Sequence, residues 1–236
     1  MSGHSKWATI KRQKGAADAK RSQVFTKLAK AVAVAARDGA DPSLNPRLRL
    51  AVDRAKAASM PKDNIERAIQ KGMGSSEDAK LEEVRYEAYG PGGVAFLIDA
   101  VTDNRNRSSS QVRHLVERSG GRMAEMGSVG WMFEQRGVLQ VAAPADRETL
   151  ELTLIEEGAT DFTEEEGTLT VTCEPHDFET VKAVLLAAKL EPSYANIEPV
   201  AKTSVTVDVG FGAKVEALRE ALDSDDDVTN TYDNAA

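Results

Sequence analysis

The sequence predicts an α+β protein: an N-terminal three-helix bundle followed by two α/β (ferredoxin-like) domains, one inserted in the other. Apolar residues recur at helical spacing up to residue 74 and alternate at strand spacing beyond residue 81. Between residues 138 and 199 the expected order of elements is βαββαβ, which is the ferredoxin-like order. The strands and helices predicted before and after this unit have no partners within it. They can belong to one domain only if the unit is inserted into that domain.

The first 74 residues are predicted to form a short basic arm, residues 1–21, and a helical bundle, residues 22–74. Apolar side chains at i, i+3, i+4 and i+7 predict the first helix, which Gly39 follows as a stop signal. Asn45 and Pro46 are an N-cap and a first-turn proline, so they predict the start of a second helix. The three helices are expected over residues 22–37, 46–59 and 61–71.

A polar stretch over residues 72–80 predicts a linker, and strand periodicity begins after it. The segment from Gly90 to Gly93 predicts a tight turn with positive φ, because it lies between two strands and lacks the Lys-Ser/Thr ending of a phosphate loop. We assign residues 81–134 plus 203–236 to one discontinuous domain. Its expected strands cover 84–89, 94–101, 129–133 and 204–209, its helices run from a cap at 102–104 to about 118 and over 213–222, and its acidic tail at 223–227 is expected to fray.

Residues 135–202 are assigned to the inserted domain. Its acidic hairpin tip, Asp161 and Glu164–Glu166, is interpreted as a solvated turn because calcium-loop spacing is absent. The expected elements are a strand over 138–141, a helix over 146–157, a hairpin of 160–163 with 168–173, a helix over 175–190 and a strand over 193–199.

The net charge of −8 conceals a strong asymmetry. Through Gly74 there are 16 Lys and Arg against 6 Asp and Glu, a net charge of +10, and the remainder carries 14 against 32, a net charge of −18. A positive segment attracts phosphate backbones and gains from counterion release, whereas an acidic one repels the same polyanion. The charges therefore predict one end that faces nucleic acid and another that faces solvent or protein.

Other function classes find little support in the sequence. The single cysteine, Cys173, excludes an internal disulfide or a cysteine zinc cluster, and Cys173 with His176 lacks the third group that would orient a catalytic pair. His4 has no second ligand at useful spacing, and no known catalytic motif is present. The first twenty residues lack an apolar signal core, and no apolar stretch approaches the length of a membrane helix. We therefore expect a cytoplasmic protein that is not an enzyme, needs no metal or cofactor and contacts no membrane.

Seven motifs resemble those of the YebC/PmpR family, in order and over essentially the whole chain. They are GHSKW at 3–7, DAKR at 18–21, NPRLR at 45–49, MPKDNIERAI at 60–69, YGPGG at 89–93, TDNRNR at 102–107 and GSVGWMF at 127–133. The resemblance implies a three-domain fold and a cytoplasmic protein of a kind described as a probable transcriptional regulator that binds promoter DNA. It also implies a translational role as an alternative, since a mitochondrial relative resembles a translational activator and bacterial members are linked to ribosomes.

The candidate nucleic-acid-binding residues combine cations for phosphate oxygens with one aromatic ring that can stack on a base. The arm contributes most of them, two helices of the bundle continue the set, and the TDNRNR motif adds two arginines near a helix N-terminus. The alternatives remain a solvated arm and helix face, and a capped turn whose arginines pair with nearby acids such as Asp99, Asp103 or Glu87. The candidates are Lys6, Trp7, Lys11, Arg12, Lys14, Lys20, Arg21, Lys27, Lys30, Arg47, Arg49, Arg105 and Arg107.

The sequence is compatible with three functions. The first is a transcriptional regulator that binds DNA through the basic N-terminal region. The second is a ribosome-associated translation factor that binds rRNA or tRNA, which Trp7 and the absence of an evident base-reading helix favour slightly. The third is a protein-interaction scaffold, because ferredoxin-like domains are frequent interaction modules. The oligomeric state does not follow from the sequence.

Overall fold

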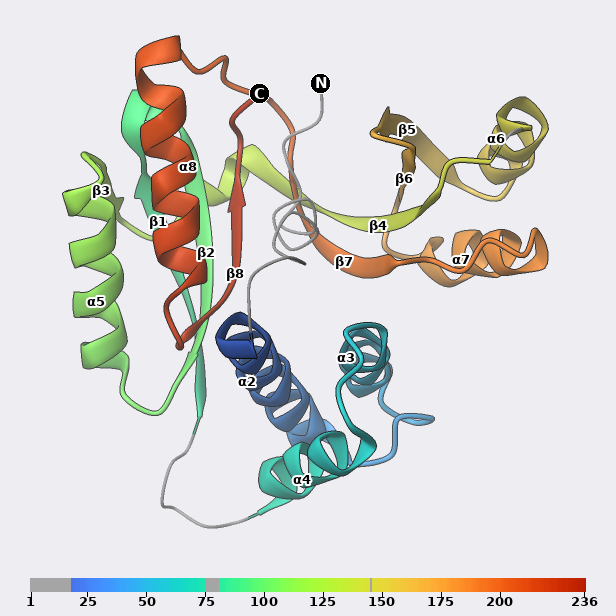
Figure 1. Cartoon of the computed structure of the whole chain (residues 1–236), viewed down its shortest axis with the longest axis horizontal. Coiled ribbons are helices and arrows are strands. Elements are labelled where there is room, and N and C mark those ends of the chain that lie inside the picture. Colours follow the sequence, from blue (N-terminus) through green and yellow to red (C-terminus); the bar gives the residue numbers. More distant parts are fainter. Residues whose placement is uncertain (1–17, 75–80, 145) are drawn as a thin grey trace. The chain divides into compact units, whose positions relative to one another are not determined.

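The computed structural model describes residues 18–74, 81–144 and 146–236, with only the backbone described for 18–21 (Figure 1). Helices combine with two four-stranded antiparallel sheets, so the predicted α+β class is confirmed. The chain divides into two compact units, and the smaller one spans Phe133–Lys202. The larger unit combines the described residues before Phe133 with Thr203–Ala236, so it is discontinuous in sequence. The finer division of the larger unit into a basic arm, a helical bundle and a discontinuous α/β domain stays a prediction.

The three predicted helices of the N-terminal segment are present. Asn45 fixes the turn between the first two, because its side chain accepts from the Leu48 N–H (3.0 Å) and donates to the carbonyl oxygens of Ala35 (2.7 Å) and Gly39 (2.8 Å). Their shared core is made of small and branched side chains, with Val32 and Leu48 fully buried. The helices are α2 (Asp18–Ala35), which continues into the 3₁₀ turn η2 (Ala36–Asp38), α3 (Pro46–Ala57) and α4 (Lys62–Met73).

The sheet of the larger unit has the strand order β3-β1-β2-β8. The hairpin of β1 and β2 lies at its centre, so its order differs from the ferredoxin-like one, in which the central strands are not consecutive. The turn of this hairpin has the positive φ that the sequence predicts, at Gly92 (+71°) and Gly93 (+80°). The elements are β1 (Glu82–Tyr89), η3 (Pro91–Gly93), β2 (Ala95–Thr102), α5 (Arg105–Arg118), β3 (Arg122–Ala124), α8 (Val209–Asp223) and β8 (Val228–Asp233).

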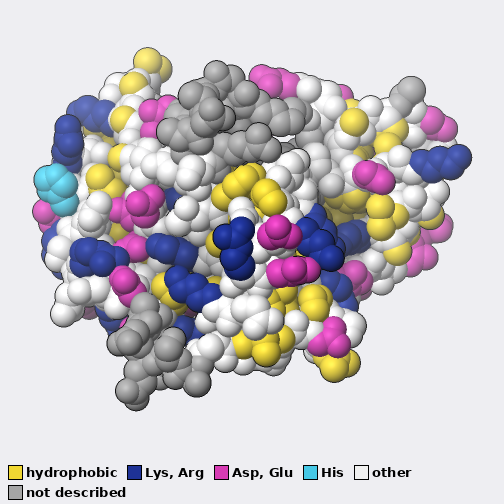
Figure 2. All heavy atoms as spheres, turned by 60° about the horizontal axis from the view of Figure 1, so that its bottom comes forward, with side chains coloured by type: hydrophobic (Ala, Val, Ile, Leu, Met, Phe, Trp, Pro, Cys, Tyr) yellow, Lys and Arg dark blue, Asp and Glu magenta, His cyan; other side chains and the backbone are white. Residues whose placement is uncertain are grey.

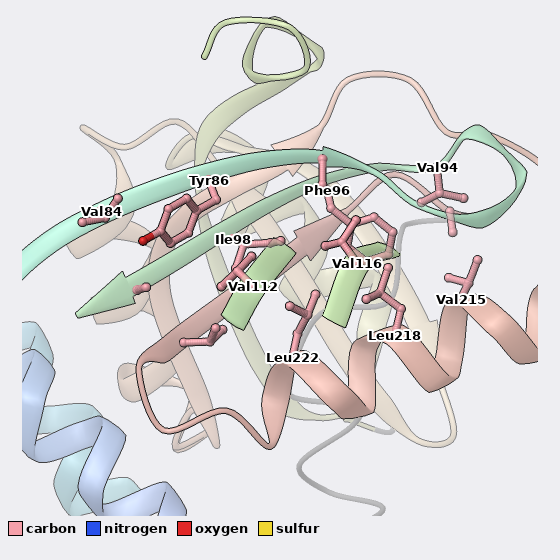
Figure 3. Packing of buried hydrophobic residues seen from close by; sticks show 14 residues of the cluster. Val84, Tyr86, Val94, Phe96, Ile98, Val112, Val116, Val215, Leu218 and Leu222 are labelled. Atoms are coloured by element: carbon pink, nitrogen blue, oxygen red, sulfur yellow. The ribbon is translucent and has the colours of Figure 1, made fainter. Parts of the chain in front are cut away.

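Helices α5 and α8 cover one face of this sheet (Figure 1). Alternate residues of β1 and β2 point at the helices, as the pairing of Tyr86 with Ile98 illustrates. Figure 3 shows these side chains meeting Val112 of α5 and Leu218 of α8. Burial of such apolar surface is the main stabilising contribution to a core of this kind. One face of α5 is therefore committed to packing, and its opposite face is exposed.

Three expectations about the larger unit are wrong. Residues 204–209 form no strand; Val205 makes one isolated bridge with Ala235, and the fourth strand is β8 instead. The tail at 223–227 is not frayed, because Asp225 and Asp227 are buried and lead into β8. Residues 130–132 form a 3₁₀ turn, η4 (Gly130–Met132), rather than part of a strand, because a carboxylate from β1 holds the backbone N–H groups there.

The smaller unit has the predicted βαββαβ order, and its sheet has the strand order β5-β6-β4-β7 of a ferredoxin-like domain. Leu139 and Val171 are paired across β4 and β6 and are fully buried, as is Leu185 of α7. The elements are β4 (Phe133–Ala142), α6 (Arg147–Glu156), β5 (Ala159–Glu165), β6 (Thr168–Cys173), α7 (Phe178–Ala187) and β7 (Tyr194–Ala201).

Candidate nucleic-acid interface

Most of the predicted arm lies outside the described residues. This holds for Lys6, Trp7, Lys11, Arg12 and Lys14. Lys20 and Arg21 belong to the first turns of α2, and their side chains are not described. The arm therefore stays a prediction.

Lys27 and Lys30 of α2 contact the acidic segment that follows α8. The Lys27 ammonium group donates to the carbonyl oxygen of Asp223. The Lys30 ammonium group donates to the carbonyl oxygen of Asp226 (2.7 Å) and to the carboxylate of Asp227 (2.8 Å). Both lysines therefore already have acceptors within the fold.

Asp227 is the central acceptor of this cluster. Besides Lys30, its carboxylate accepts from Arg107 (2.9 Å) and from the Thr102 hydroxyl (2.9 Å). Burial alone would raise the pKa of Asp227, but the hydrogen bonds from Lys30, Arg107 and Thr102 outweigh it and lower the pKa below its ordinary value. One ionised carboxylate therefore links α2, the end of β2 and the start of α5.

The TDNRNR motif is a capped helix start, in agreement with the alternative of a capped turn whose arginines pair with nearby acids. The Asn104 side chain accepts from the Arg107 N–H (3.1 Å), which makes it the N-cap of α5. Arg107 pairs with Asp103 (2.8 Å) and also with Asp227, a partner that the sequence does not reveal. Both arginines are exposed, but Arg105 forms no ion pair with a described residue, so the two differ in how available they are to a ligand.

The two candidates on α3 also differ. Arg47 pairs with Glu83 at the start of β1 and lies 3.6 Å from Asp38, while Arg49 is half-buried. The helical segment carries further basic side chains that are exposed. These are Arg37, Lys56, Lys62, Arg67 and Lys71.

Sequence reasoning missed a second basic region on α5 and β3. Arg113, Arg118 and Arg122 are all exposed, and the nearby Trp131 is 62% exposed. The signal that could have found them is local charge: residues 105–122 hold five of the 14 basic residues beyond Gly74 and one of the 32 acidic ones. The average over a strongly acidic segment conceals this group.

The described residues offer little for covalent or metal chemistry. Burial, and then the charges of Asp177 and Glu174, raise the pKa of Cys173 to about 11, so its thiol stays protonated at neutral pH. In the ranges 18–74, 81–144 and 146–236, no three His, Cys, Asp or Glu side chains are grouped so that they could hold a metal ion. Within the same ranges, no helix combines the length and apolar character that crossing a bilayer requires.

Comparisons with known proteins cover the whole chain. Family models described as the TACO1/YebC protein N-terminal domain and the TACO1/YebC second and third domain match residues 5–75 and 81–235. Proteins named "Probable transcriptional regulatory protein" from Maridesulfovibrio salexigens and Treponema pallidum are 46% and 48% identical, covering 100% of this chain and 95% and 97% of theirs. The crystal structure of a conserved hypothetical protein from Aquifex aeolicus matches with a TM-score of 0.86 and 39% identity, covering 94% of this chain and 93% of that one.

Proposed function

Because the chain belongs to the TACO1/YebC family, we propose that it is a nucleic-acid-binding regulator of gene expression that grips its target through the basic N-terminal region. The observation that carries this proposal is the segregation of charge, +10 through Gly74 against −18 beyond it. A segment of that charge gains affinity for a polyanion by releasing counterions. The names of the relatives favour DNA as the target and control of transcription as the outcome.

RNA is the second candidate target, with control of translation as the outcome. Two aromatic residues favour it, Trp7 in the arm and the exposed Trp131, because aromatic rings stack readily on unpaired bases. The exposed basic side chains of α3 and α4 suit phosphates of either nucleic acid.

The arm is tested by replacing Lys11, Arg12, Lys14, Lys20 and Arg21 with Ala in the full-length protein. Duplex DNA and single-stranded RNA of matched length are titrated at several salt concentrations. We expect weaker binding to all sequences alike and a shallower dependence of affinity on salt, because up to five phosphate contacts are lost. If the variant binds as tightly as the parent at every salt concentration, the arm is not the site.

The target is identified by crosslinking in cells followed by sequencing of bound DNA and bound RNA. Enrichment at promoters with RNA at background supports transcriptional control, and enrichment on rRNA or tRNA supports translational control. A scaffold function predicts instead that protein partners survive nuclease treatment in a pull-down.

A further inference from the structure

The exposed face of α5 is basic in a part of the chain that is otherwise acidic. The helix packs on the sheet through Ser108, Val112 and Val116, which are buried. Arg113 and Arg118 lie off that face and are exposed. Within the part of the chain that the structure describes, neither forms an ion pair. Figure 2 shows Lys and Arg side chains on the left of the view, the side on which Figure 1 draws α5 and β3, and others at its centre and right.

A chain of contacts links Arg122, which follows α5 in the chain, to an exposed tryptophan. Arg122, which opens β3, lies with its guanidinium carbon 5.0 Å from the centre of the Tyr89 ring. The Tyr89 hydroxyl donates to the Ser128 carbonyl oxygen (3.2 Å), and the Trp131 indole N–H donates to the same oxygen (3.0 Å). Trp131 is nevertheless 62% exposed. An arginine, a tyrosine and a tryptophan are therefore held together at the edge of the sheet.

A buried carboxylate braces the loop that carries this tryptophan. Glu87 of β1 accepts from the backbone N–H groups of Gly127 (2.8 Å), Val129 (2.7 Å) and Gly130 (3.1 Å). Burial would raise the pKa of Glu87, but these three donors together with Arg85 outweigh it and lower the pKa. Gly127 has φ +88°, a conformation that favours glycine. The loop is therefore pre-organised, and binding through Trp131 costs little ordering of the backbone.

We propose that Arg113, Arg118, Arg122 and Trp131 form a second RNA-binding surface, which takes a short unpaired segment with one base stacked on the Trp131 indole. We call these four residues the α5–β3 surface. The arginines supply donors to the phosphates that flank the stacked base. The inference rests on the proposed function for the class of ligand, but its residues differ from those of the arm.

Two features of the surface favour unpaired RNA over an acidic protein or duplex DNA. The arginines alone would suffice to bind an acidic protein, and such a partner would not require an exposed indole on a pre-organised loop. Duplex DNA keeps its bases stacked inside the helix, so Trp131 would find no partner, whereas unpaired RNA offers both base faces and phosphates. The segment 113–131 holds two acidic residues, Glu117 and Glu125, against three arginines, so its net charge is positive.

The chain contains two tryptophans, so one substitution isolates the signal. In the Trp7→Phe protein, Trp131 is the single emitter, and a 12-nucleotide oligouridylate is titrated while its fluorescence is followed. We expect quenching that saturates together with binding measured by the anisotropy of labelled RNA. In the same background, Arg113→Glu, Arg118→Glu and Arg122→Glu combined should weaken binding about tenfold or more and remove the quenching. Trp131→Ala should weaken binding about tenfold.

A matched control separates this surface from total charge. Lys189→Glu, Lys202→Glu and Lys214→Glu change the net charge equally at exposed positions elsewhere beyond Gly74. We expect this variant to bind within about twofold of the Trp7→Phe parent. Equal weakening in the control and the arginine variant would overturn the proposal, because the effect would then be one of net charge. Circular dichroism of each variant verifies that it is folded.

The outcomes also separate this inference from the proposed function. If the parent binds neither RNA nor DNA, both fail. If the parent binds and the arm variant weakens binding while the arginine variant does not, the arm stands and the α5–β3 surface is overturned. If duplex DNA binds this surface as tightly as RNA does, without quenching Trp131, the choice of ligand is wrong. If the arginine variant weakens RNA binding and the arm variant does not, the α5–β3 surface is supported and the arm is no longer part of the proposed function.

Discussion

Helices α2 and α5 are both rich in basic residues, yet they use them in opposite ways. In α2, Lys27 and Lys30 donate to oxygens of the segment from Asp223 to Asp227. On α5, the exposed Arg113 and Arg118 make no ion pair with any described residue. A count of charges gives the two helices equal weight as ligand sites. The contacts indicate that the described lysines of α2 stabilise the fold, whereas the outer arginines of α5 are available to a partner.

The largest loss of stability is expected on replacing Asp227, because this carboxylate is the acceptor that ties Lys30 of α2 to the fold. Replacing Asp227 with Ala removes the shared acceptor of Lys30, Arg107 and Thr102. We expect a loss of about 2–3 kcal/mol in the free energy of unfolding, because charge-assisted hydrogen bonds to a largely buried group are lost. Urea denaturation followed by circular dichroism measures it.

The neighbouring Asp226→Ala is the matched control. The Asp226 residue is exposed, and its contact with Lys30 uses the backbone carbonyl oxygen, which the substitution keeps. We expect a change within about 0.5 kcal/mol. Equal stability of both variants and the parent would show that Asp227 is no counterion of the fold.

The same carboxylate predicts how stability depends on acid. Since the folded pKa of Asp227 lies below the ordinary 3.8, ionised Asp227 stabilises the fold above that value, and the contribution is lost as pH falls through the folded pKa. The stability gap between the parent and Asp227→Asn should therefore be constant above about pH 5 and narrow below about pH 4. Urea midpoints at stepped pH give this gap, and a gap that widens in acid would contradict the assignment.

A smaller loss of stability is expected on replacing Glu87 of β1, which holds the loop that carries Trp131. In Glu87→Gln one acceptor oxygen becomes an amide N–H₂ facing backbone donors, so we expect a loss of about 1–2 kcal/mol in the free energy of unfolding. In the Trp7→Phe background the fluorescence anisotropy of Trp131 should also fall, because the loop loses its brace. Glu82→Gln, at an exposed position of the same strand, is the control and should change neither measurement. Unchanged anisotropy in Glu87→Gln would mean that the loop is held by other contacts.

The regular helices and strands of the fold follow from the periodicity of apolar residues. The wrongly predicted strand at 204–209 and the missed strand β8 have a common cause. The helices of the N-terminal segment and the βαββαβ unit have clear apolar patterns and capping residues such as Asn45. Residues 204–209 alternate like a strand but pair only through the single bridge of Val205 with Ala235, so no ladder forms. Strand β8 follows an acidic run and buries only Val228 and Thr231, so its local pattern is weak. Pairing with β2 decides its structure, and no local pattern contains that information.

The candidate site was less predictable than the fold because charge alone does not say which cations are already paired. The contact of Lys30 with Asp227 joins residues 197 positions apart, which no local motif reveals. The role of Glu87 was equally hidden, since the sequence offers it only as a partner for a nearby arginine. Arg122 and Trp131 were within reach of sequence reasoning, because their basic and aromatic character stands out in the composition around them.

The smallest effects give the sharpest test of the comparison between α2 and α5. Lys30→Ala should lower the free energy of unfolding by about 1 kcal/mol and leave RNA affinity within about twofold, because its ammonium group already has acceptors in the fold. Arg113→Ala should leave stability within about 0.5 kcal/mol and weaken RNA binding about threefold, since one phosphate contact is lost. The threefold loss should shrink as salt rises, whereas the stability loss of Lys30→Ala should change less, because its ion pair is only partly exposed. If Lys30→Ala weakened RNA binding more than Arg113→Ala, nucleic acid would compete with Asp227 for α2, and the division between a structural and a binding helix would be wrong.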